Sequence, residues 1–413
     1  MKRVDNSYWQ IIHGQPSQTA TWRFLHSVSK DRQIMSSSNS ELKIVWWIDH
    51  LGPGGSQRIL TRLVEHMADQ GARQTVICLN AASDNELIDR IALAGADLYI
   101  LGKERLLLGF GLIPIWNRLI RRGACDVSVS FLFYADLVGT LMSWLGNVPI
   151  RISAQRSSND HYSKLRCKMI RIVLKKATCI VLNNSAYRSR TKRFLPNRTS
   201  VCVIPNGVDV SHERAVGSEK HLHTVLKLPL DTPLIGCVGR LSEEKRVADV
   251  IRALALLETT TPHLVLIGEG PQRMHLIKVA ESLDLANRVH FLGNWRDTRA
   301  IFGDLAIYIL ASSFEGMANS LMEAMVAECP VAVSDIDANL ELVGSNEHGW
   351  TFRVGDIQNL AEVIALILRS PEQVNSRTRA ARSHIESCYT EERMLQAWQA
   401  ILEKSTASDF GRL

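Results

Sequence analysis

The sequence predicts an α/β protein of two domains, each a parallel sheet covered by helices. Three observations indicate this. The chain has 413 residues, more than one hydrophobic core usually accommodates, so two domains are expected. Short apolar segments alternate with longer amphipathic ones, which is typical of strands joined by helices in a parallel sheet. The pattern closes at 201–209 (VCVIPNGVD), a short strand followed by a Pro-Asn-Gly turn, and starts again at 234.

Apolar runs of strand length occur throughout both halves. A strand covered on both faces is expected to be almost continuously apolar. In the first half such runs predict strands at 43–49, 75–79, 98–101, 127–132, 150–154 and 180–183, with helices at 56–69, 86–94, 135–145 and 163–176. In the second half they predict strands at 234–238, 263–268, 289–293, 307–311 and from 331, with helices from about 246, from 319 to before Pro330, and at 360–368, 371–386 and 391–402.

Residues 1–40 differ from the rest of the chain. They are polar and aperiodic and end in the run SSSNS, so we expect a poorly ordered extension. The predicted division is therefore an extension at 1–40, a first domain at 41–210, a second domain at 211–390, and a last helix with its tail at 391–413.

The composition is typical of a cytoplasmic enzyme. Hydrophobic residues make up 46% and charged residues 22% of the chain, which are ordinary globular values. The eight cysteines are scattered without a C-x-x-C pair, which favours reduced thiols over a zinc site or a disulfide framework. No apolar run reaches the ~18 residues of a membrane span, and the N-terminus lacks the apolar core of a secretory signal. We therefore expect a cytoplasmic location.

The charge is unevenly distributed. Residues 41–215 carry 24 Lys and Arg against 14 Asp and Glu, a net charge of +10, whereas residues 216–413 carry −7. A basic first half suggests an anionic partner. No nucleic-acid-binding module accompanies the charge, so nucleic acid is not expected as a partner and an anionic bilayer is favoured.

Residues 163–176 (SKLRCKMIRIVLKK) are the best candidate for contact with a bilayer. Four apolar residues recur at helical spacing among six basic ones, and such a helix can lie on anionic lipid. The alternative is a helix that packs its apolar residues against the sheet and leaves its charges in water. The apolar residues are Leu165, Met169, Ile172 and Val173, and the basic residues are Lys164, Arg166, Lys168, Arg171, Lys175 and Lys176.

The stretch 312–335 (SSFEGMANSLMEAMVAECPVAVSD) joins a polar turn to the start of a helix. The unpaired N–H groups and the positive dipole end of a helix start can hold a phosphate. Glu315 in the turn and Glu323 about one turn inside the helix flank this position, where their carboxylates can accept hydrogen bonds from sugar hydroxyls. The alternative is that the two carboxylates cap the helix on a solvated face.

A glycine turn follows the first strand. Residues 51–55 (LGPGG) lead from the strand into a helix, and in many α/β proteins such an arrangement cradles a phosphate or a substrate. Gly54 and Gly55 lie next to the helix. A tight turn without a ligand is the alternative.

A cationic turn follows the strand at 234–238. In residues 239–245 (GRLSEEK), Arg240 and Lys245 can converge on a diphosphate, the Arg through its planar fork and the Lys as a point charge. The alternative is that they form salt bridges with Glu243 and Glu244.

Together these residues resemble the donor site of the retaining family-4 glycosyltransferases, also called glycosyltransferases group 1. The stretch from Glu315 to Glu323 resembles their E-x7-E signature, G-R-L-x-x-E-K at 239–245 their diphosphate-binding loop, and I-P-N-G-V-D at 204–209 their interdomain junction. The resemblance continues in order over most of the chain from about residue 43. It implies the GT-B fold, in which two Rossmann-like, doubly wound domains face each other across a cleft and the last helix crosses back to the first domain.

The resemblance also implies roles for individual residues. Glu315 would lie beside the donor sugar, and Glu323 would bind the ribose of the nucleotide. Arg240 and Lys245 would neutralise the leaving diphosphate, so these two and Glu315 are the expected catalytic residues, and no metal or other cofactor is expected. The remaining expected donor-binding residues are Gly54, Gly55, Gly316, Asn319, Ser320 and Leu321.

The implied reaction is sugar transfer from a nucleoside-diphosphate sugar, with retention, to a hydroxyl of a sugar or lipid-linked acceptor. Assembly of bacterial lipopolysaccharide, another surface polysaccharide or a glycolipid is the implied setting. Alternatives are a nucleotide-sugar epimerase, a sugar-phosphate synthase of the same fold, or a non-catalytic relative. A nicotinamide oxidoreductase is not expected, because neither half has a G-x-G-x-x-G turn.

The segment 126–139 (DVSVSFLFYADLVG) departs from the family pattern. Related enzymes often carry histidines after this strand, one of them beside the reacting sugar, whereas Phe131 and Tyr134 occupy the matching positions here. This departure supports the alternative of a non-catalytic relative. Other polar candidates on this side of the cleft are Arg151, Arg156 and His161.

Overall fold

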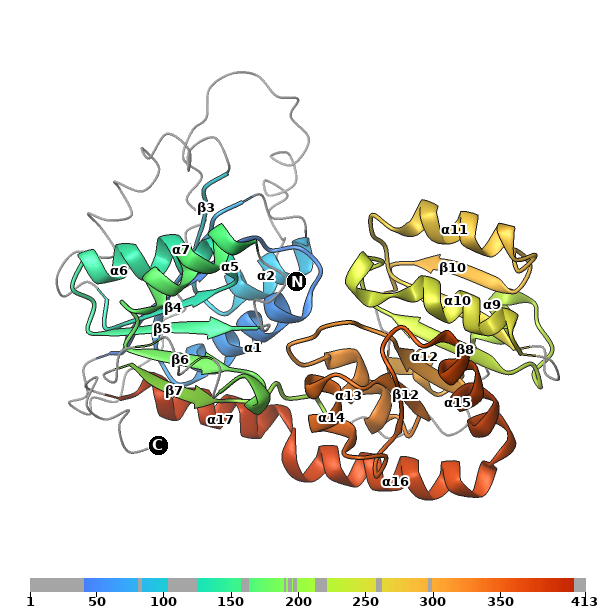
Figure 1. Cartoon of the computed structure of the whole chain (residues 1–413). Helices are drawn as coiled ribbons and strands as arrows, with labels where there is room; N and C mark the ends of the chain where they lie inside the picture. Colours follow the sequence, from blue (N-terminus) through green and yellow to red (C-terminus); the bar gives the residue numbers. More distant parts are fainter. Residues whose placement is uncertain are drawn as a thin grey trace, which may run out of the picture.

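The computed structural model describes residues 41–80, 84–102, 125–156, 163–188, 191, 195, 199–211, 221–257, 262–295 and 299–404. Two parallel sheets lie side by side, each with helices on its faces (Figure 1). The extension expected at 1–40, the candidate His161 and the tail from 405 lie outside the described residues.

The first sheet has seven parallel strands in the order β3-β2-β1-β4-β5-β6-β7. The strands are β1 (Lys43–Ile48), β2 (Arg73–Cys78), β3 (Asp97–Ile100), β4 (Val127–Phe131), β5 (Ile150–Gln155), β6 (Cys179–Leu182) and β7 (Ser200–Val203). Each strand expected in this half is present. Apart from the edge strand β3, their apolar side chains are largely buried. The order reverses between β1 and β4, which makes the sheet doubly wound.

The helices of the first half follow the predicted pattern, with one irregularity. They are α1 (Gly55–Asp69), α2 (Asn85–Leu93), α5 (Phe133–Ala135), η3 (Asp136–Thr140), α6 (Leu141–Leu145), α7 (Lys164–Leu174) and the short turn η4 (Ser185–Tyr187). The single helix expected at 135–145 is three segments, because residues 136–140 form a π-helical turn. Such turns are rare and are often found at functional sites.

The second sheet has six parallel strands in the order β10-β9-β8-β11-β12-β13, which again reverses in the middle. The strands are β8 (Leu234–Val238), β9 (His263–Ile267), β10 (Val289–Gly293), β11 (Ile307–Leu310), β12 (Val331–Ser334) and β13 (Trp350–Phe352). The described helical elements are α9 (His221–Leu226), η5 (Glu243–Lys245), α10 (Val247–Ala255), α11 (Arg273–Ser282), α12 (Arg299–Phe302), α13 (Asn319–Val326), α14 (Asp337–Val343), α15 (Ile357–Arg369), α16 (Pro371–Cys388) and α17 (Glu391–Leu402).

The chain passes between the two sheets twice at one place. Val208 donates its N–H to the carbonyl of Tyr389 at 2.9 Å, and Glu391 donates to the carbonyl of Val208 at 2.9 Å. After this crossing α17 lies along the first sheet (Figure 1) and buries Trp398 completely in the core around β1, β4 and β5. The last helix that the structure describes is thus part of the first hydrophobic core.

The helix α7 does not pack all of its apolar residues against the sheet, as the alternative to membrane contact predicted. Its buried residues are Ile170 and Leu174, whereas Leu165, Met169 and Ile172 are 68%, 43% and 55% exposed. The expectation that these three residues pack against the sheet is therefore wrong. They remain on the outside together with the basic residues of the helix.

Candidate active site

Ligand sites of doubly wound sheets lie at the carboxyl ends of the strands where the strand order reverses. In the second sheet the reversal lies between β8 and β11. Two turns leave these strands: the Arg240 turn, residues 239–245, and the Glu315 turn, residues 312–318. The strand order therefore places the two segments that the sequence analysis selected next to each other.

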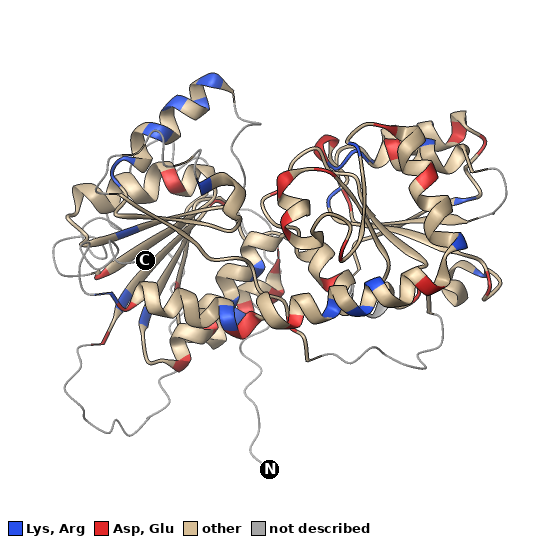
Figure 2. Ribbon diagram, turned by 60° about the horizontal axis from the view of Figure 1, so that its bottom comes forward, with Lys and Arg blue, Asp and Glu red and all other residues tan. Residues whose placement is uncertain are grey.

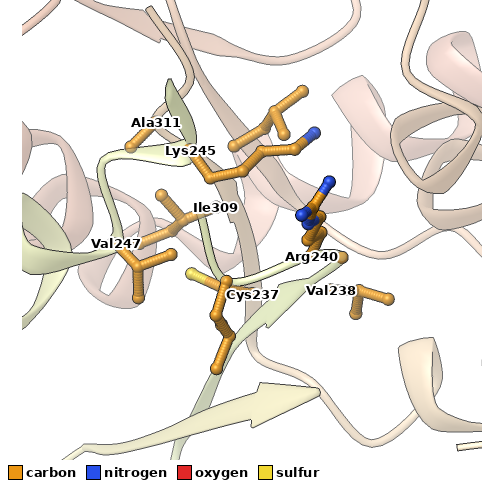
Figure 3. Close-up of a pocket in the computed structure, with 10 residues that line it drawn as sticks. Cys237, Val238, Arg240, Lys245, Val247, Ile309 and Ala311 are labelled. Carbon is orange, nitrogen blue, oxygen red and sulfur yellow. The ribbon is translucent and has the colours of Figure 1, made fainter. Parts of the chain in front are cut away.

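A small pocket lies beneath the Arg240 turn (Figure 3). Its walls are mainly apolar and come from the ends of β8 and β11, with Val247 from the start of α10. Arg240 and Lys245 belong to the lining, and their charged ends extend to the same side of the pocket (Figure 3). Two cations thus face one region next to an apolar wall.

An ion pair connects the two turns. The Lys245 ammonium contacts Oε1 of Glu315, and the Ser312 hydroxyl donates to the same oxygen at 2.6 Å. The Lys245 and Glu315 side chains are only 21% and 13% exposed. Lys245 therefore pairs with Glu315, and the alternative in which it pairs with Glu243 or Glu244 is wrong.

Arg240 is differently placed. It is exposed, and no carboxylate lies within ion-pair distance of it among the described residues. Its positive charge acts on His50 of the first domain. Burial of His50 and, after it, the charge of Arg240 lower the pKa of His50. The Arg240 guanidinium is available to an anionic ligand in the space between the two domains.

The helix α13 begins directly after the Glu315 turn. No side chain caps its N-terminus, where Ala318 occupies the capping position. Glu315 instead binds Lys245 and Ser312, so the expectation that it caps the helix is wrong. The first N–H groups of α13 thus lack a side-chain acceptor and retain their positive partial charge.

The first residues of α13 are fixed by their side chains. Asn319 accepts a hydrogen bond from Asn206 at 2.8 Å, and the Ser320 hydroxyl bonds with that of Tyr308 at 2.8 Å. Leu321 is fully buried in the second core. The backbone N–H groups of Asn319 and Ser320 begin the helix, whereas the N–H of Leu321 already donates to the carbonyl of Ala318 at 3.1 Å. Glu323, half-buried, lies one turn further along.

Two predicted glycine positions approach this region closely. A side chain at Gly55 would come within 3.2 Å of the Asn319 amide nitrogen, so the glycine turn after β1 reaches the start of α13. Gly54, next to it, packs against Gln57 of α1. A Cβ at Gly316 would lie 1.9 Å from the carbonyl oxygen of Arg156. Only glycine permits this approach of the two domains.

The comparisons with known proteins agree with this geometry. Residues 53–212 match the family described as "Glycosyltransferase Family 4", and residues 218–384 match "Glycosyl transferases group 1". The chain belongs to this family of glycosyltransferases. Together the two matched ranges include both sheets and both turns described above.

The glycosyltransferase has relatives among enzymes of polysaccharide assembly. It is 26% identical over 330 residues to the lipopolysaccharide core biosynthesis glycosyltransferase LpsE of Rhizobium meliloti, an alignment covering 77% of this chain and 87% of the relative. It is 23% identical over 343 residues to a Campylobacter jejuni N-acetylgalactosaminyltransferase whose name specifies a diphospho-undecaprenol acceptor, with 79% of this chain and 90% of the relative covered.

Solved structures establish the fold. The structure of Anabaena HepE in complex with UDP and glucose superposes with a TM-score of 0.77 at 19% identity, covering 88% of this chain and 99% of the other. The HepE complex with UDP superposes with a TM-score of 0.74. The fold of the glycosyltransferase is therefore GT-B, as predicted.

Several candidates on the first domain of the glycosyltransferase are not where the sequence analysis expected them. Phe131 is fully buried, with its ring stacked on that of Trp398 at 5.9 Å. Arg151 lies near the start of β5, at the opposite end from the strand's carboxyl edge, and donates to the carbonyl of Lys176 at 2.8 Å. Arg156 is half-buried and donates to Asn206. Tyr134 alone is substantially exposed, and its hydroxyl accepts a hydrogen bond from Arg166.

Two buried carboxyl groups near the cleft were missed. Asp136, in the π-helical turn, accepts hydrogen bonds from Ser130, Ser153 and Gln155 at 2.6–2.7 Å, and its complete burial raises its pKa to about 7. Asp49, at the end of β1, accepts from the backbone N–H groups of Tyr134 and Ala135, and burial raises its pKa to about 6.

These carboxyl groups hold the segment that follows β4. That segment starts at Leu132, whose φ of 76° is unfavourable for a residue with a side chain. The position of Asp49 after an apolar strand was a usable signal in the sequence. No comparable pattern marked Asp136, because a single carboxylate in a helical stretch is normally exposed.

Among the described residues, no group of three or more His, Cys, Asp or Glu is arranged to hold a metal ion. Within the same part of the chain, none of the helices combines the length and apolar character that crossing a bilayer requires.

The variant Asp136→Asn is expected to change how stability depends on pH. Because burial raises the folded-state pKa of Asp136 from 3.8 to about 7, ionising this group costs more in the folded protein than in the unfolded chain. This penalty is absent below the unfolded pKa and grows as pH rises from about 4 to about 7. Asn cannot ionise, so the variant should lose less unfolding free energy than the wild type between about pH 4 and pH 8.

Urea unfolding over this pH range measures the difference between the two proteins. Asp49 is present in both proteins, and its raised pKa lowers the free energy of unfolding of both as pH rises. If the free energy of unfolding depended on pH in the same way in the wild type and in Asp136→Asn, Asp136 would not ionise in this range.

Proposed function

We propose that this glycosyltransferase moves a sugar, with retention at the anomeric carbon, from a nucleoside-diphosphate sugar to an acceptor hydroxyl. The proposal is carried by one observation: Arg240 and Lys245 line one pocket, and Lys245 pairs with Glu315 in the turn that leads directly into the uncapped start of α13. Cations and helix N–H groups of this kind suit a diphosphate, and carboxylates suit sugar hydroxyls.

The arrangement supports catalysis mainly through charge. In the reaction the bond between the anomeric carbon and the diphosphate oxygen breaks, a bond to the acceptor oxygen forms, and the hydroxyl proton leaves with the diphosphate. Arg240, Lys245 and the first N–H groups of α13 stabilise the negative charge that develops on the leaving group. Glu315, held by Lys245 and Ser312, orients the sugar, and Glu323 accepts from the ribose.

The donor and the acceptor are proposed by analogy with relatives. UDP and UDP-glucose complexes of HepE support a UDP-sugar as donor. The lipopolysaccharide-core and diphospho-undecaprenol enzymes support a sugar or lipid-linked acceptor in bacterial surface polysaccharide assembly. No metal is needed in this mechanism, because the two cations and the helix start supply the positive charge that a metal would provide.

The variants Arg240→Ala and Lys245→Ala test the proposal. Each should lower kcat/KM by about 10²-fold or more, because charge on the leaving diphosphate is left uncompensated. The measurement is release of nucleoside diphosphate from a panel of UDP-sugars in the presence of acceptor saccharides. Lys278→Ala, which removes an exposed cation on α11, is the matched control and should keep wild-type activity.

Chelation tests the proposed independence from metals in the same assay. Turnover should continue in EDTA. Complete loss in EDTA, with recovery on addition of Mg²⁺ or Mn²⁺, would contradict the metal-free mechanism. Unchanged kinetics in both site variants would place the diphosphate elsewhere.

We also propose that the enzyme works at the inner face of the plasma membrane. The membrane-facing surface would consist of α6 and α7, which are linked by Lys176 lying over the ring of Trp144 at 3.9 Å. In Figure 2, Lys and Arg follow one another along a helix at the outer edge of the first domain, where α7 lies. The exposed apolar residues of this surface are Leu141, Trp144, Leu145, Leu165, Met169 and Ile172.

This combination of side chains suits an anionic bilayer more than water. Basic residues near an anionic surface each contribute about 1 kcal/mol, and this attraction weakens with salt. Large exposed apolar side chains beside them can insert among the lipid head groups. A lipid-linked acceptor would then reach the cleft from the surface on which the enzyme lies.

The membrane proposal predicts binding to anionic but not neutral vesicles at low salt. Changing Lys164, Arg166, Lys168 and Arg171 together to Glu should abolish cosedimentation, because attraction becomes repulsion. Turnover of a short water-soluble acceptor should survive, since the cationic turns lie in the other domain. Changing Leu165, Met169 and Ile172 to Ser should weaken the binding that persists at high salt. Equal binding to both vesicle types, or none to either, would contradict the proposal.

A further inference from the structure

The Glu315 turn belongs to the second domain, but the first domain contacts it at both ends. At one end the Tyr187 hydroxyl, on the short turn η4 that follows β6, donates to the backbone carbonyl of Glu315 at 2.8 Å. This bond fixes the backbone of the residue whose carboxylate binds Lys245.

A chain of side-chain hydrogen bonds reaches the other end of the turn. Arg156, at the end of β5, donates through Nη1 to Oδ1 of Asn206 at 2.9 Å. Asn206 donates through Nδ2 to Oδ1 of Asn319 at 2.8 Å. Asn319 is the first residue of α13, so this chain joins the first sheet to the helix start that the diphosphate would occupy.

The Arg156 side chain is held in an unusual environment. Its guanidinium lies over the rings of Phe131 and Trp398, at 4.8 and 5.6 Å from their centroids. Nε and Nη2 are buried and have no hydrogen-bond acceptor among the described residues, and burial lowers its pKa to about 9. Donors that are shielded from water and unused are costly. Nη1 does have an acceptor in Asn206, and this bond orients the guanidinium.

Gly316 makes the contact between the domains direct. A Cβ there would lie 1.9 Å from the Arg156 carbonyl oxygen and 3.0 Å from the Asn183 amide nitrogen. The backbone of the Glu315 turn therefore rests on the carboxyl ends of β5 and β6. Together with Tyr187 and Asn206, this contact leaves the turn little freedom as long as the two domains stay together.

We infer that the first domain positions the Glu315 turn for sugar transfer, with Tyr187 and the Arg156–Asn206 pair as positioning residues. The inference rests on the proposed function of the turn. Arg240, Lys245 and Glu323 all belong to the second domain and can hold a nucleoside diphosphate without these contacts. Transfer additionally needs Glu315, which is the residue that Tyr187 holds, in its correct place relative to the sugar. Nucleotide affinity and turnover should therefore be separable.

The variant Tyr187→Phe tests this separation. It removes one hydroxyl, so the bond to the Glu315 carbonyl is lost while the ring remains. The affinity for UDP, measured by calorimetry, should stay within about twofold of the wild type. The turnover number should fall by about 10- to 100-fold, the range that a small misplacement of reacting groups causes.

The matched control is Ser185→Ala on the same turn. The Ser185 hydroxyl also crosses between the domains, but it donates to Glu341 of α14 at 2.9 Å, away from the Glu315 turn. This variant should keep the wild-type turnover number. A loss in Ser185→Ala as large as in Tyr187→Phe would mean that domain contact in general, and not positioning of the turn, was disturbed.

Asn206 provides an independent pair of variants. Asn206→Ala breaks the chain from Arg156 to Asn319 and should lower turnover like Tyr187→Phe. Asn206→Asp should restore most of it, because its carboxylate can accept from both Arg156 and the Asn319 amide after that amide turns over. Thermal unfolding identifies any variant that fails to fold, in which case Tyr187→Phe alone decides.

The results distinguish this inference from the proposed function. A wild-type protein that neither binds UDP nor turns over any UDP-sugar overturns both. A wild-type protein that transfers sugar, with an unchanged turnover number in Tyr187→Phe and in Asn206→Ala, overturns only the inference that the first domain positions the turn.

Discussion

The ion pair between Lys245 and Glu315 connects the two segments on which the candidate site depends. Lys245 ends the turn after β8 and Glu315 lies in the turn after β11, and these strands are neighbours where the strand order reverses. Both side chains are largely shielded from water, so leaving either charge unpaired would be costly. The pair, together with Ser312, therefore keeps the Glu315 carboxylate oriented in the protein without its substrates.

The surroundings of this pair come from both domains. The glycine turn after β1 reaches Asn319, His50 senses the charge of Arg240, and Gly316 rests on the end of β5. The chain first passes between the domains at Val208, two residues after Asn206, and it returns at Tyr389, which is hydrogen-bonded to Val208. The helix α17 then anchors the returning chain in the first core. The carboxyl ends of strands from both sheets therefore border one shared space. In doubly wound sheets, ligands bind at the carboxyl ends of the strands where the strand order reverses.

Much of the fold and of the site was predictable because local patterns and strand order decide them. Apolar runs predicted the strands β1 to β6 and β8 to β12, and the turns that carry Arg240 and Glu315 follow β8 and β11. Several elements escaped prediction. Some were too short for a clear period, such as β13 with three residues and α9 with six. The ten-residue α11 escaped because it buries only Leu276 and Ala280, too few apolar positions for a helical pattern.

The side chains of the first domain were less predictable. Whether Phe131, Arg151 and Arg156 face the cleft depends on the direction in which each leaves its strand and on α17, which joins this core from the far end of the chain. The buried Asp136 is supported by hydroxyl and amide groups from two other elements. Such contacts depend on tertiary packing, which no local sequence pattern records.

The most direct test of the account is calorimetric titration of UDP into the wild-type protein and Glu323→Ala, both in EDTA. If the nucleotide lies at the start of α13, the wild type binds UDP without a metal. Loss of a charged, half-buried acceptor for the ribose should then weaken binding by about 1.5–3 kcal/mol, roughly 10- to 150-fold. Equal affinity for UDP in the wild type and in a folded Glu323→Ala would contradict the account and remove Glu323 from the site.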